Sequence, residues 1–208
     1  MPQEGEDWID TLMRVDENMS GAIVLPLRAR PLLKLIEYAV HGFPWIIVSS
    51  LTAVFAYAYR WNENVQYGLL VLNIGLLVDL AAVGLVKIIV QRERPVENVD
   101  DQIFEAPIAD QYSFPSGHTS RATMLGVLLS YFFPRLTPIG VAVPLMVAYS
   151  RVAMGRHYFT DVIGEYVCYM KYHLRTNTWR IDWWSCSSHS HGCQSMDEET
   201  FLMRCIVF

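Results

Sequence analysis

The chain has 208 residues, the length of one domain, and its formal net charge is −5. An acidic chain lacks the basic surface that nucleic-acid binding requires, so we expect no nucleic-acid partner. Hydrophobic residues make up 52% of the chain and charged residues 18%, with a mean hydropathy of +0.22. This composition favours an integral membrane protein, with a soluble protein of very apolar core as the alternative.

The N-terminal part, residues 1–27, is predicted to be a polar, acidic segment that precedes the main domain. It lacks the basic start and apolar stretch of a cleaved signal peptide, so we expect the protein to keep it. The residues that follow carry apolar positions at helical spacing, namely Leu32, Leu33, Leu35, Ile36 and Ala39. They predict an amphipathic helix that either lies at the membrane surface or packs against the domain.

Long apolar runs fill the middle of the chain, over residues 43–59, 65–90, 123–133 and 139–154. A helix that spans a membrane takes roughly 17 to 25 residues. We therefore expect four spanning helices and a weaker fifth over residues 162–174, a run interrupted by charged residues. The predicted fold class is an all-α transmembrane helical bundle.

The orientation of this bundle follows from its cations. Pairs of crossings return the chain to the side of its N-terminus, first near residue 90 and again near residue 150. That side carries Arg28, Arg30, Lys34, Arg92 and Arg94, whereas the opposite loops carry Arg60 and Arg135. The positive-inside rule predicts that the first side is cytoplasmic.

Three polar clusters reach that same side. They are KIIVQRERP with Lys87 and Arg94, PSGH with Ser116, Gly117 and His118, and SRVAMGRHYFTD with Arg151, His157 and Asp161. Each cluster alone has an ordinary explanation, such as a snorkelling lysine or a capped helix start. All three together, in this order and at these spacings, indicate a site for a phosphoryl group.

The residue types suit that group because a phosphoryl group in transfer carries charge on three equatorial oxygens. Lys87 offers a point charge, and Arg94 and Arg151 offer planar forks that bind pairs of oxygens. Ser116 and Gly117 precede an apolar helix, whose first backbone N–H groups make an anion site. Gly117 has no side chain to obstruct the phosphate.

The histidines supply the chemistry. His157 and Asp161 are four residues apart and would share one face of a helix. The carboxylate can hold one ring nitrogen protonated and leave the other free to attack phosphorus. His118 would be the general acid for the leaving oxygen. This arrangement predicts a phosphohistidine intermediate that water hydrolyses, whereas His41 and His173 are expected to be structural.

These motifs resemble those of the type 2 phosphatidic acid phosphatase superfamily, which includes lipid phosphate phosphatases and vanadium haloperoxidases. The resemblance covers roughly residues 28–174 and implies an all-helical membrane phosphatase domain there. It implies His157 as nucleophile, His118 as acid and Asp161 as the group that orients the nucleophile. It also implies phosphate contacts from Lys87, Arg94, Ser116, Gly117 and Arg151, with no metal and no other cofactor.

A finer resemblance concerns the substrate. The segments LLKLIEYAVHGFPW, YSFPSGHTSRA and GRHYFTDV are most similar to polyisoprenoid diphosphate phosphatases, a branch that includes a presqualene diphosphate phosphatase. This implies a lipid phosphate substrate, membrane lipids as partners, and a location in the endoplasmic reticulum or nuclear envelope.

Two segments depart from that pattern. The loop over residues 96–114 is acidic but shows no metal-ligand spacing, and its apolar residues either form a lid or pack on the helix ends. Residues 175–208 read as a divergent, disordered tail. The tail contains Cys186, His189, His191 and Cys193, whose spacing matches no strong zinc template.

Three functions compete on this evidence. The leading one is an integral-membrane phosphatase for lipid phosphates or diphosphates, such as polyisoprenoid diphosphates, presqualene diphosphate or phosphatidate. A vanadate-dependent haloperoxidase is a second, against which the spanning helices argue. A catalytically inactive membrane scaffold of the same fold is a third, against which the intact His118, His157 and Asp161 argue.

Overall fold

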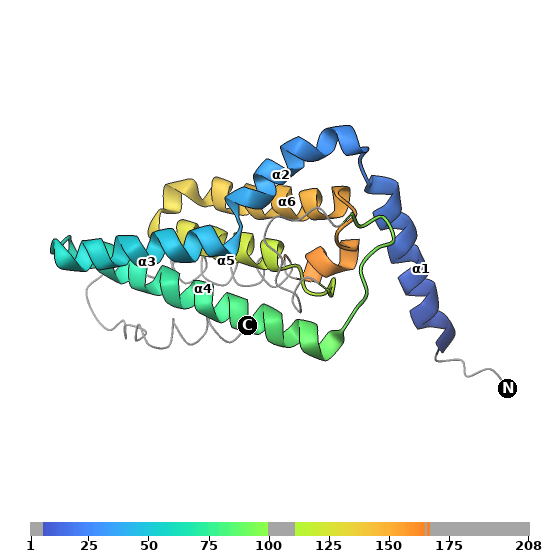
Figure 1. The fold of residues 1–208 in the computed structure, drawn as a ribbon, viewed down its shortest axis with the longest axis horizontal. Coiled ribbons are helices and arrows are strands. Elements are labelled where there is room, and N and C mark those ends of the chain that lie inside the picture. Colours follow the sequence, from blue (N-terminus) through green and yellow to red (C-terminus); the bar gives the residue numbers. More distant parts are fainter. Residues whose placement is uncertain (1–5, 100–110, 165, 167–208) are drawn as a thin grey trace, which may run out of the picture.

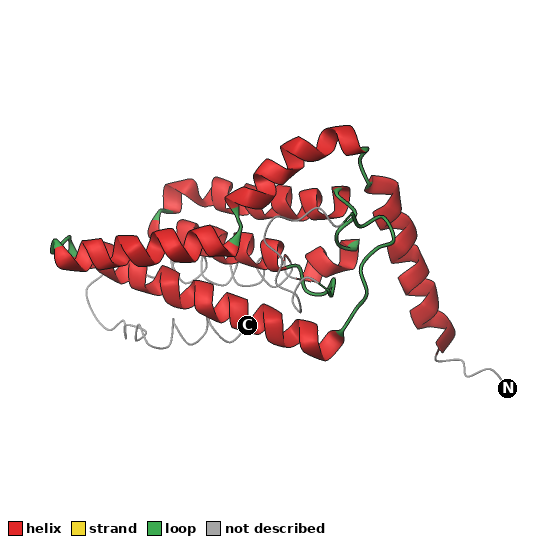
Figure 2. Ribbon diagram, viewed as in Figure 1, coloured by secondary structure: helices red, strands yellow, loops and turns green. Residues whose placement is uncertain are grey.

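The computed structural model describes residues 6–99, 111–164 and 166, and within that part of the chain it contains helices and no strand (Figure 2). The α-helices are α1 (Glu6–Ile23), α2 (Arg30–Ala39), α3 (Gly42–Ala58), α4 (Glu63–Val90), α5 (Gly117–Phe132) and α6 (Thr137–Ala153). Short 3₁₀ helices cover Leu27–Ala29 and Pro134–Leu136. The predicted all-α class is confirmed.

Helices α3 to α6 run side by side as a bundle, and α1 crosses one end of it (Figure 1). The end of α4, the start of α5 and the end of α6 all lie toward α1, whereas the α3–α4 turn lies at the opposite end. The three polar clusters of the sequence are therefore carried to one end of the bundle. That is the arrangement the topology predicted.

Three segments of the described chain are long and apolar enough to cross a membrane: Leu27–Ala58, Glu63–Val90 and Pro134–Ala153. The expected number of four is wrong by this measure, because α5 has 16 residues and is shorter than these. Helix α5 instead packs between α4 and α6. Helical structure after His157 covers residues 159–164 and 166, and the rest of the predicted fifth run lies outside the described residues.

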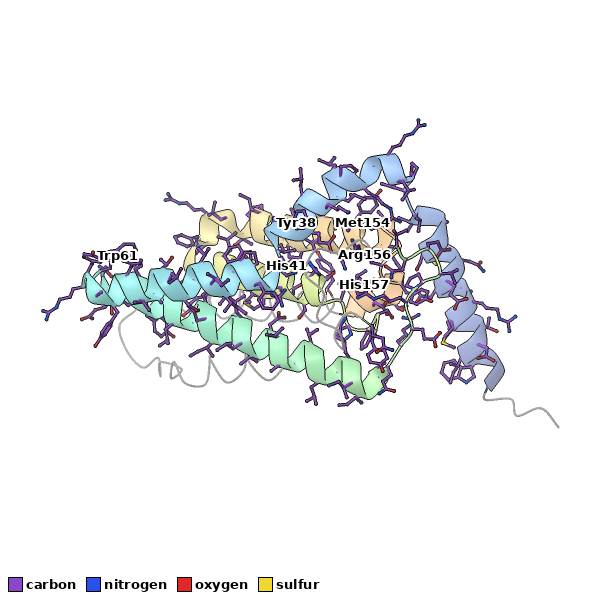
Figure 3. All side chains as sticks on the ribbon, viewed as in Figure 1. Tyr38, His41, Trp61, Met154, Arg156 and His157 are labelled. Atoms are coloured by element: carbon purple, nitrogen blue, oxygen red, sulfur yellow. The ribbon has the colours of Figure 1, made fainter. Side chains whose placement is uncertain are left out.

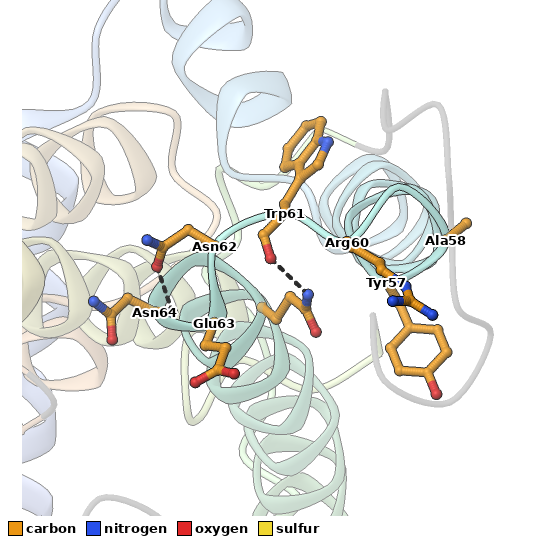
Figure 4. A pocket seen from close by; sticks show the side chains of 8 residues that line it. Tyr57, Ala58, Arg60, Trp61, Asn62, Glu63 and Asn64 are labelled. Atoms are coloured by element: carbon orange, nitrogen blue, oxygen red, sulfur yellow. Dashed lines mark hydrogen bonds between the residues drawn. The ribbon is translucent and has the colours of Figure 1, made fainter.

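The outer surface of the bundle suits lipid. Large apolar side chains such as Leu51, Val54, Leu77 and Leu85 are each more than half exposed, as expected where the solvent is hydrocarbon rather than water. Tyr57, Tyr59 and Trp61 are exposed at the α3–α4 turn, the kind of aromatic belt that marks a membrane interface. A pocket beside that turn is lined by eight of the residues from Tyr57 to Gln66 (Figure 4), far from the polar clusters.

Polar contacts inside the bundle join α4 to both neighbours. Asn73 of α4 accepts hydrogen bonds from Ser49 and Ser50 of α3, at 3.0 and 2.8 Å. Asp79 of α4 pairs with Arg121 of α5 at 3.0 Å, and both side chains are buried. Because hydrocarbon offers no other partner, such groups must satisfy each other across the helices. Asn73 and Asp79, the polar residues that interrupt the second apolar run, therefore fix the rotation of α4 relative to α3 and α5.

Helices α5 and α6 approach each other closely at two glycines. A side chain on Gly126 would overlap the carbonyl of Gly140, and a Cβ on Gly140 would lie 2.6 Å from the Gly126 carbonyl oxygen. Small residues at a crossing allow this approach in membrane proteins. The pair thus sets the spacing of the two helices that carry His118 and Arg151.

Helices α1 and α2 complete the end of the bundle that carries the clusters. Leu33 of α2 is buried against Ala153 and Met154 at the end of α6, while Leu32 and Leu35 remain more than 60% exposed. Helix α2 therefore both packs on the domain and presents apolar side chains outward. The predicted polar segment 1–27 contains a full helix, α1. The three-part division of the chain stays a prediction, and the tail at 175–208 lies outside the described residues.

Candidate active site

The PSGH cluster starts α5. Ser116 is the N-cap, and its hydroxyl accepts from the backbone N–H of Thr119 at 3.4 Å, as serine does at the first turn of a helix. Ser116 is fully buried. A Cβ on Gly117 would lie 3.4 Å from Val83 of α4. This is an ordinary van der Waals distance, so packing of α5 on α4 does not itself require glycine, and the role of Gly117 beside phosphate stays a prediction.

A tight turn after α6 directs Arg156 and His157 into the protein. Gly155 has φ +67°, and a Cβ there would lie 3.0 Å from Glu97 Cβ and 3.1 Å from the Glu97 carbonyl oxygen. This left-handed conformation against another backbone favours glycine. Figure 3 shows Met154, Arg156 and His157 together at the end of α6. Arg156 and His157 are almost completely buried.

His157 lies in this turn rather than on a helix, since helical structure begins again at residue 159. The prediction that His157 and Asp161 share one helix face is therefore wrong in detail. The two side chains are nevertheless close, with Nδ1 of His157 3.7 Å from Oδ2 of Asp161. That separation exceeds a hydrogen bond. The turn, not helix periodicity, brings imidazole and carboxylate together.

The other imidazole nitrogen faces a cation. His157 Nε2 lies 3.4 Å from Arg151 Nη2. An arginine can only donate, so Nε2 is the acceptor and the proton of the neutral ring sits on Nδ1, the side of Asp161. The lone pair of His157 thus points to the guanidinium that is expected to hold phosphate.

Lys87 and Arg94 are brought to the same place. Lys87 is 4% exposed and donates to the Tyr112 carbonyl oxygen at 2.8 Å. The pKa of His157 is lowered well below 6.5, first by burial and then by the positive charges of Arg151, Arg94 and Lys87. We call Lys87, Arg94 and Arg151 the cation cluster. An imidazole beside it stays neutral, which is the form a nucleophile needs.

His118 is the second residue of α5. Its Nε2 lies 3.9 Å from Oε1 of Glu37, and its ring stands edge-on to that of His41, with centroids 5.7 Å apart. Glu37 also pairs with Arg151 at 2.9 Å, so His118 and Arg151 meet at one carboxylate. The predicted acid and the predicted phosphate ligand are therefore neighbours.

Glu37 was not predicted to belong to the site. It is 4% exposed and pairs with Arg156 at 3.2 Å as well as with Arg151. A signal was present, because Glu37 follows Leu33 by four residues and so lies on the inward side of α2. A carboxylate on a buried face requires a cation. The sequence did not indicate which cation.

Arg92 was missed too. Its guanidinium donates to Asp161 Oδ1 at 2.5 Å and lies 4.0 Å above the ring of Tyr158. The other oxygen of Asp161 accepts the backbone N–H of Tyr158 at 2.9 Å. Burial raises the pKa of Asp161, and the charge of Arg92 opposes that rise. Asp161 is thus held beside His157 from two directions.

Within the described residues, no group of three or more His, Cys, Asp and Glu side chains is placed to hold a metal ion. Fold and site together define an all-helical integral membrane protein with two histidines beside a cation cluster in which Lys87 and Arg151 are buried. The chain belongs to the PAP2 superfamily. The model of that family matches residues 68–169, a stretch that contains all three polar clusters.

The chain is similar to several phosphatases. The chain is 33% identical to the probable lipid phosphate phosphatase beta of Arabidopsis thaliana, over 43% of this chain and 54% of that protein. It is 29% identical to the decaprenylphosphoryl-5-phosphoribose phosphatase of Mycolicibacterium smegmatis, over 76% of this chain and 80% of that protein. It is 27% identical to the undecaprenyl-diphosphatase of Sulfolobus acidocaldarius, over 60% of this chain and 58% of that protein. The chain thus spans about half the length of the plant relative.

A solved structure shares the fold. The crystal structure of the transmembrane PAP2 type phosphatidylglycerolphosphate phosphatase from Bacillus subtilis superposes with a TM-score of 0.57. The match covers 83% of this chain and 87% of that one, at 22% sequence identity. It confirms the helical membrane fold that the sequence predicted.

Proposed function

We propose that this protein is an integral-membrane phosphatase that hydrolyses phosphate or diphosphate esters of lipids. The observation that carries the proposal is the meeting of His157 with Arg151, Arg94 and Lys87, contributed by segments far apart in the chain. A cluster of buried and half-buried cations beside a neutral imidazole is suited to a tetrahedral anion and its transfer. The relatives named as lipid phosphate and undecaprenyl diphosphate phosphatases favour the same chemistry.

The proposed reaction uses the two histidines in turn. Nε2 of His157 attacks phosphorus, the bond from phosphorus to the leaving oxygen breaks, and His118 gives that oxygen its proton. Lys87, Arg94 and Arg151, with the N–H groups at Ser116 and Gly117, neutralise the oxygens of the transferring group. Water then attacks phosphorus and gives a proton to His118, the bond from phosphorus to Nε2 breaks, and orthophosphate leaves with both histidines restored. Asp161 orients the ring throughout, held by Arg92.

The proposed substrates are polyisoprenoid diphosphates, presqualene diphosphate or phosphatidate. A head group that reaches the cation cluster can leave its chain in the lipid, because the cluster lies at one end of the bundle. Two relatives named for decaprenyl and undecaprenyl compounds favour isoprenoid chains. We further propose that the protein works without a metal, in the endoplasmic reticulum or nuclear envelope, with its site toward the cytoplasm.

The test is phosphate release by purified protein in detergent from farnesyl diphosphate and from phosphatidate. The His157→Ala variant should release no phosphate while still inserting in membranes, because it lacks the nucleophile. Activity of the parent protein should persist in EDTA. Loss on chelation with recovery in Mg²⁺ would refute the metal-free mechanism. A parent protein that releases phosphate from no lipid phosphate would favour the scaffold reading, and vanadate-dependent halide oxidation would favour the haloperoxidase.

A further inference from the structure

Helix α1 supplies hydrogen-bond acceptors to the segment that follows His157. The first N–H groups of any helix have no partner within it. Here the N–H of Phe159 donates to the hydroxyl of Ser20 at 2.8 Å, and the N–H of Thr160 donates to Oδ1 of Asp16 at 3.1 Å. Asp16 and Ser20 are 6% and 3% exposed. Two residues one turn apart on α1 thus cap a helix that begins about 140 positions later in the chain.

Asp16 also reaches Asp161 through Arg92. Its Oδ2 accepts from Arg92 Nη2 at 2.7 Å, and Nη1 of the same guanidinium donates to Asp161. The hydroxyl of Thr160 donates to Asp16 as well. Arg92 is therefore clamped between two carboxylates, one from α1 and one beside His157. Charge-assisted contacts of this kind are stronger than neutral ones and fix geometry.

Helix α1 turns its polar side, not its apolar side, toward the bundle, so these polar contacts determine how it packs there. Trp8, Leu12, Val15 and Met19 are between 48% and 58% exposed, although an amphipathic helix usually turns its apolar side inward. The inward side of α1 instead presents Asp16 and Ser20. Ile23, at its end, adds an apolar contact with Met154 and Ala153. The polar contribution of α1 is thus concentrated on the segment that carries Asp161.

We propose that Asp16, assisted by Ser20, is a positioning residue for the nucleophile. By fixing residues 159–161 and the guanidinium of Arg92, it holds Asp161 beside Nδ1 of His157 and keeps Nε2 turned to Arg151. The N-terminal helix is on this view a part of the active site. The inference rests on the proposed phosphatase function.

The experiment compares Asp16→Ala, Asp16→Asn and Ser20→Ala with Asp10→Asn, an exposed acid on the same helix. With farnesyl diphosphate, kcat of Asp16→Ala should fall by about tenfold to hundredfold, the size of effect that slight misplacement of reacting groups produces. KM and inhibition by orthophosphate should change by less than about threefold, because the cation cluster stays intact. Asp16→Asn keeps an acceptor for Thr160 but loses the charge, so its kcat should be intermediate.

A double variant separates positioning from general weakening of the fold. If Asp16 acts through Arg92, Asp16→Ala together with Arg92→Ala should lose little more kcat than Arg92→Ala alone. The inference would be overturned if the fold-losses in kcat of the two single variants multiplied in the double variant. It would also be overturned if kcat of Asp16→Ala lay within twofold of that of Asp10→Asn. Should Asp16→Ala fail to fold, Asp16→Asn and Ser20→Ala decide it by the same comparison.

A parent protein without phosphatase activity would refute the proposed function but leave the positioning role testable. Hydrogen exchange then reports on the backbone N–H groups of Phe159 and Thr160. Asp16→Ala should accelerate exchange in the peptide that contains them, and Asp10→Asn should not. Equal exchange in both variants would overturn the role of Asp16, whatever the activity.

Discussion

His157 is an imidazole enclosed by cations, and its acid–base behaviour follows from that enclosure. Burial, followed by the charges of Arg151, Arg94 and Lys87, lowers its pKa well below 6.5. Attack on phosphorus requires the neutral ring. The acidic limb of the kcat/KM profile, which reports the free enzyme, should therefore lie below pH 6.5. Removing one cation makes protonation easier and raises the pKa. In Arg94→Gln the limb should therefore move to higher pH.

The measurement is kcat/KM against pH for the parent and Arg94→Gln with the same substrate, so that ionisation of the substrate phosphate cancels. The level of activity will fall in the variant because Arg94 is also expected to bind phosphate, but only the position of the limb matters. An unchanged limb, or one shifted to lower pH, would show that the charge of Arg94 does not act on His157.

At this scale the sequence could predict residue types but not all partners. Lys87, Arg94, Arg151 and His157 were predicted together because phosphate chemistry demands them and three spaced motifs contain them. Asp16 and Arg92 are 76 positions apart and Asp16 and Thr160 are 144 apart. Such pairings depend on how α1 docks, and no local pattern encodes that. Their polar character alone gave no reason to place them at the site.

Among the elements, the crossing of α5 and α6 depends on the absence of side chains at Gly126 and Gly140. Adding a methyl group at Gly126 would place it on the Gly140 carbonyl, so the helices must separate. We expect Gly126→Ala to destabilise the protein by about 1–3 kcal/mol, the usual cost of overpacking. Separation would also move His118 relative to Arg151 and reduce activity.

The control is Gly84→Ala on α4, where an added Cβ meets nothing within 4 Å. Alanine there should be neutral or stabilising by up to about 1 kcal/mol, the difference in helix propensity. Thermal unfolding of the two variants in the same detergent makes the comparison. Equal melting temperatures would show that the α5–α6 contact tolerates a side chain.

The elements themselves were predictable where apolar runs are long. The predicted runs 43–59 and 65–90 correspond closely to α3 and α4. Helix α1 was not predicted, because its many acidic residues hid the apolar positions at Trp8, Leu12, Val15 and Met19. Helix α5 begins at Gly117, six residues before the apolar run at 123, since its first turn is polar and capped by Ser116.

At the scale of the whole molecule, the two ends of the bundle differ and would face opposite sides of the membrane. The cation cluster, α1 and the end of α4 lie at one end, and the exposed Tyr57, Tyr59 and Trp61 mark the other. Arg92 and Arg94 follow the span Glu63–Val90 at the first end and support the proposal that this end is cytoplasmic. On that proposal, the proposed product orthophosphate is released into the cytoplasm. The orientation is open to a direct test.

The test uses single cysteines in a protein whose Cys168, Cys186, Cys193 and Cys205 are changed to serine. Asp10→Cys reports on the end with the cation cluster, and Glu63→Cys reports on the opposite end; both positions are exposed. Neither change removes a cation, so the charge bias that sets orientation is kept. In sealed microsomes, whose cytoplasmic face is outward, an impermeant maleimide should label Asp10→Cys at once and Glu63→Cys only after detergent. The reverse order would place the site in the lumen, because the two ends of one bundle cannot share a side.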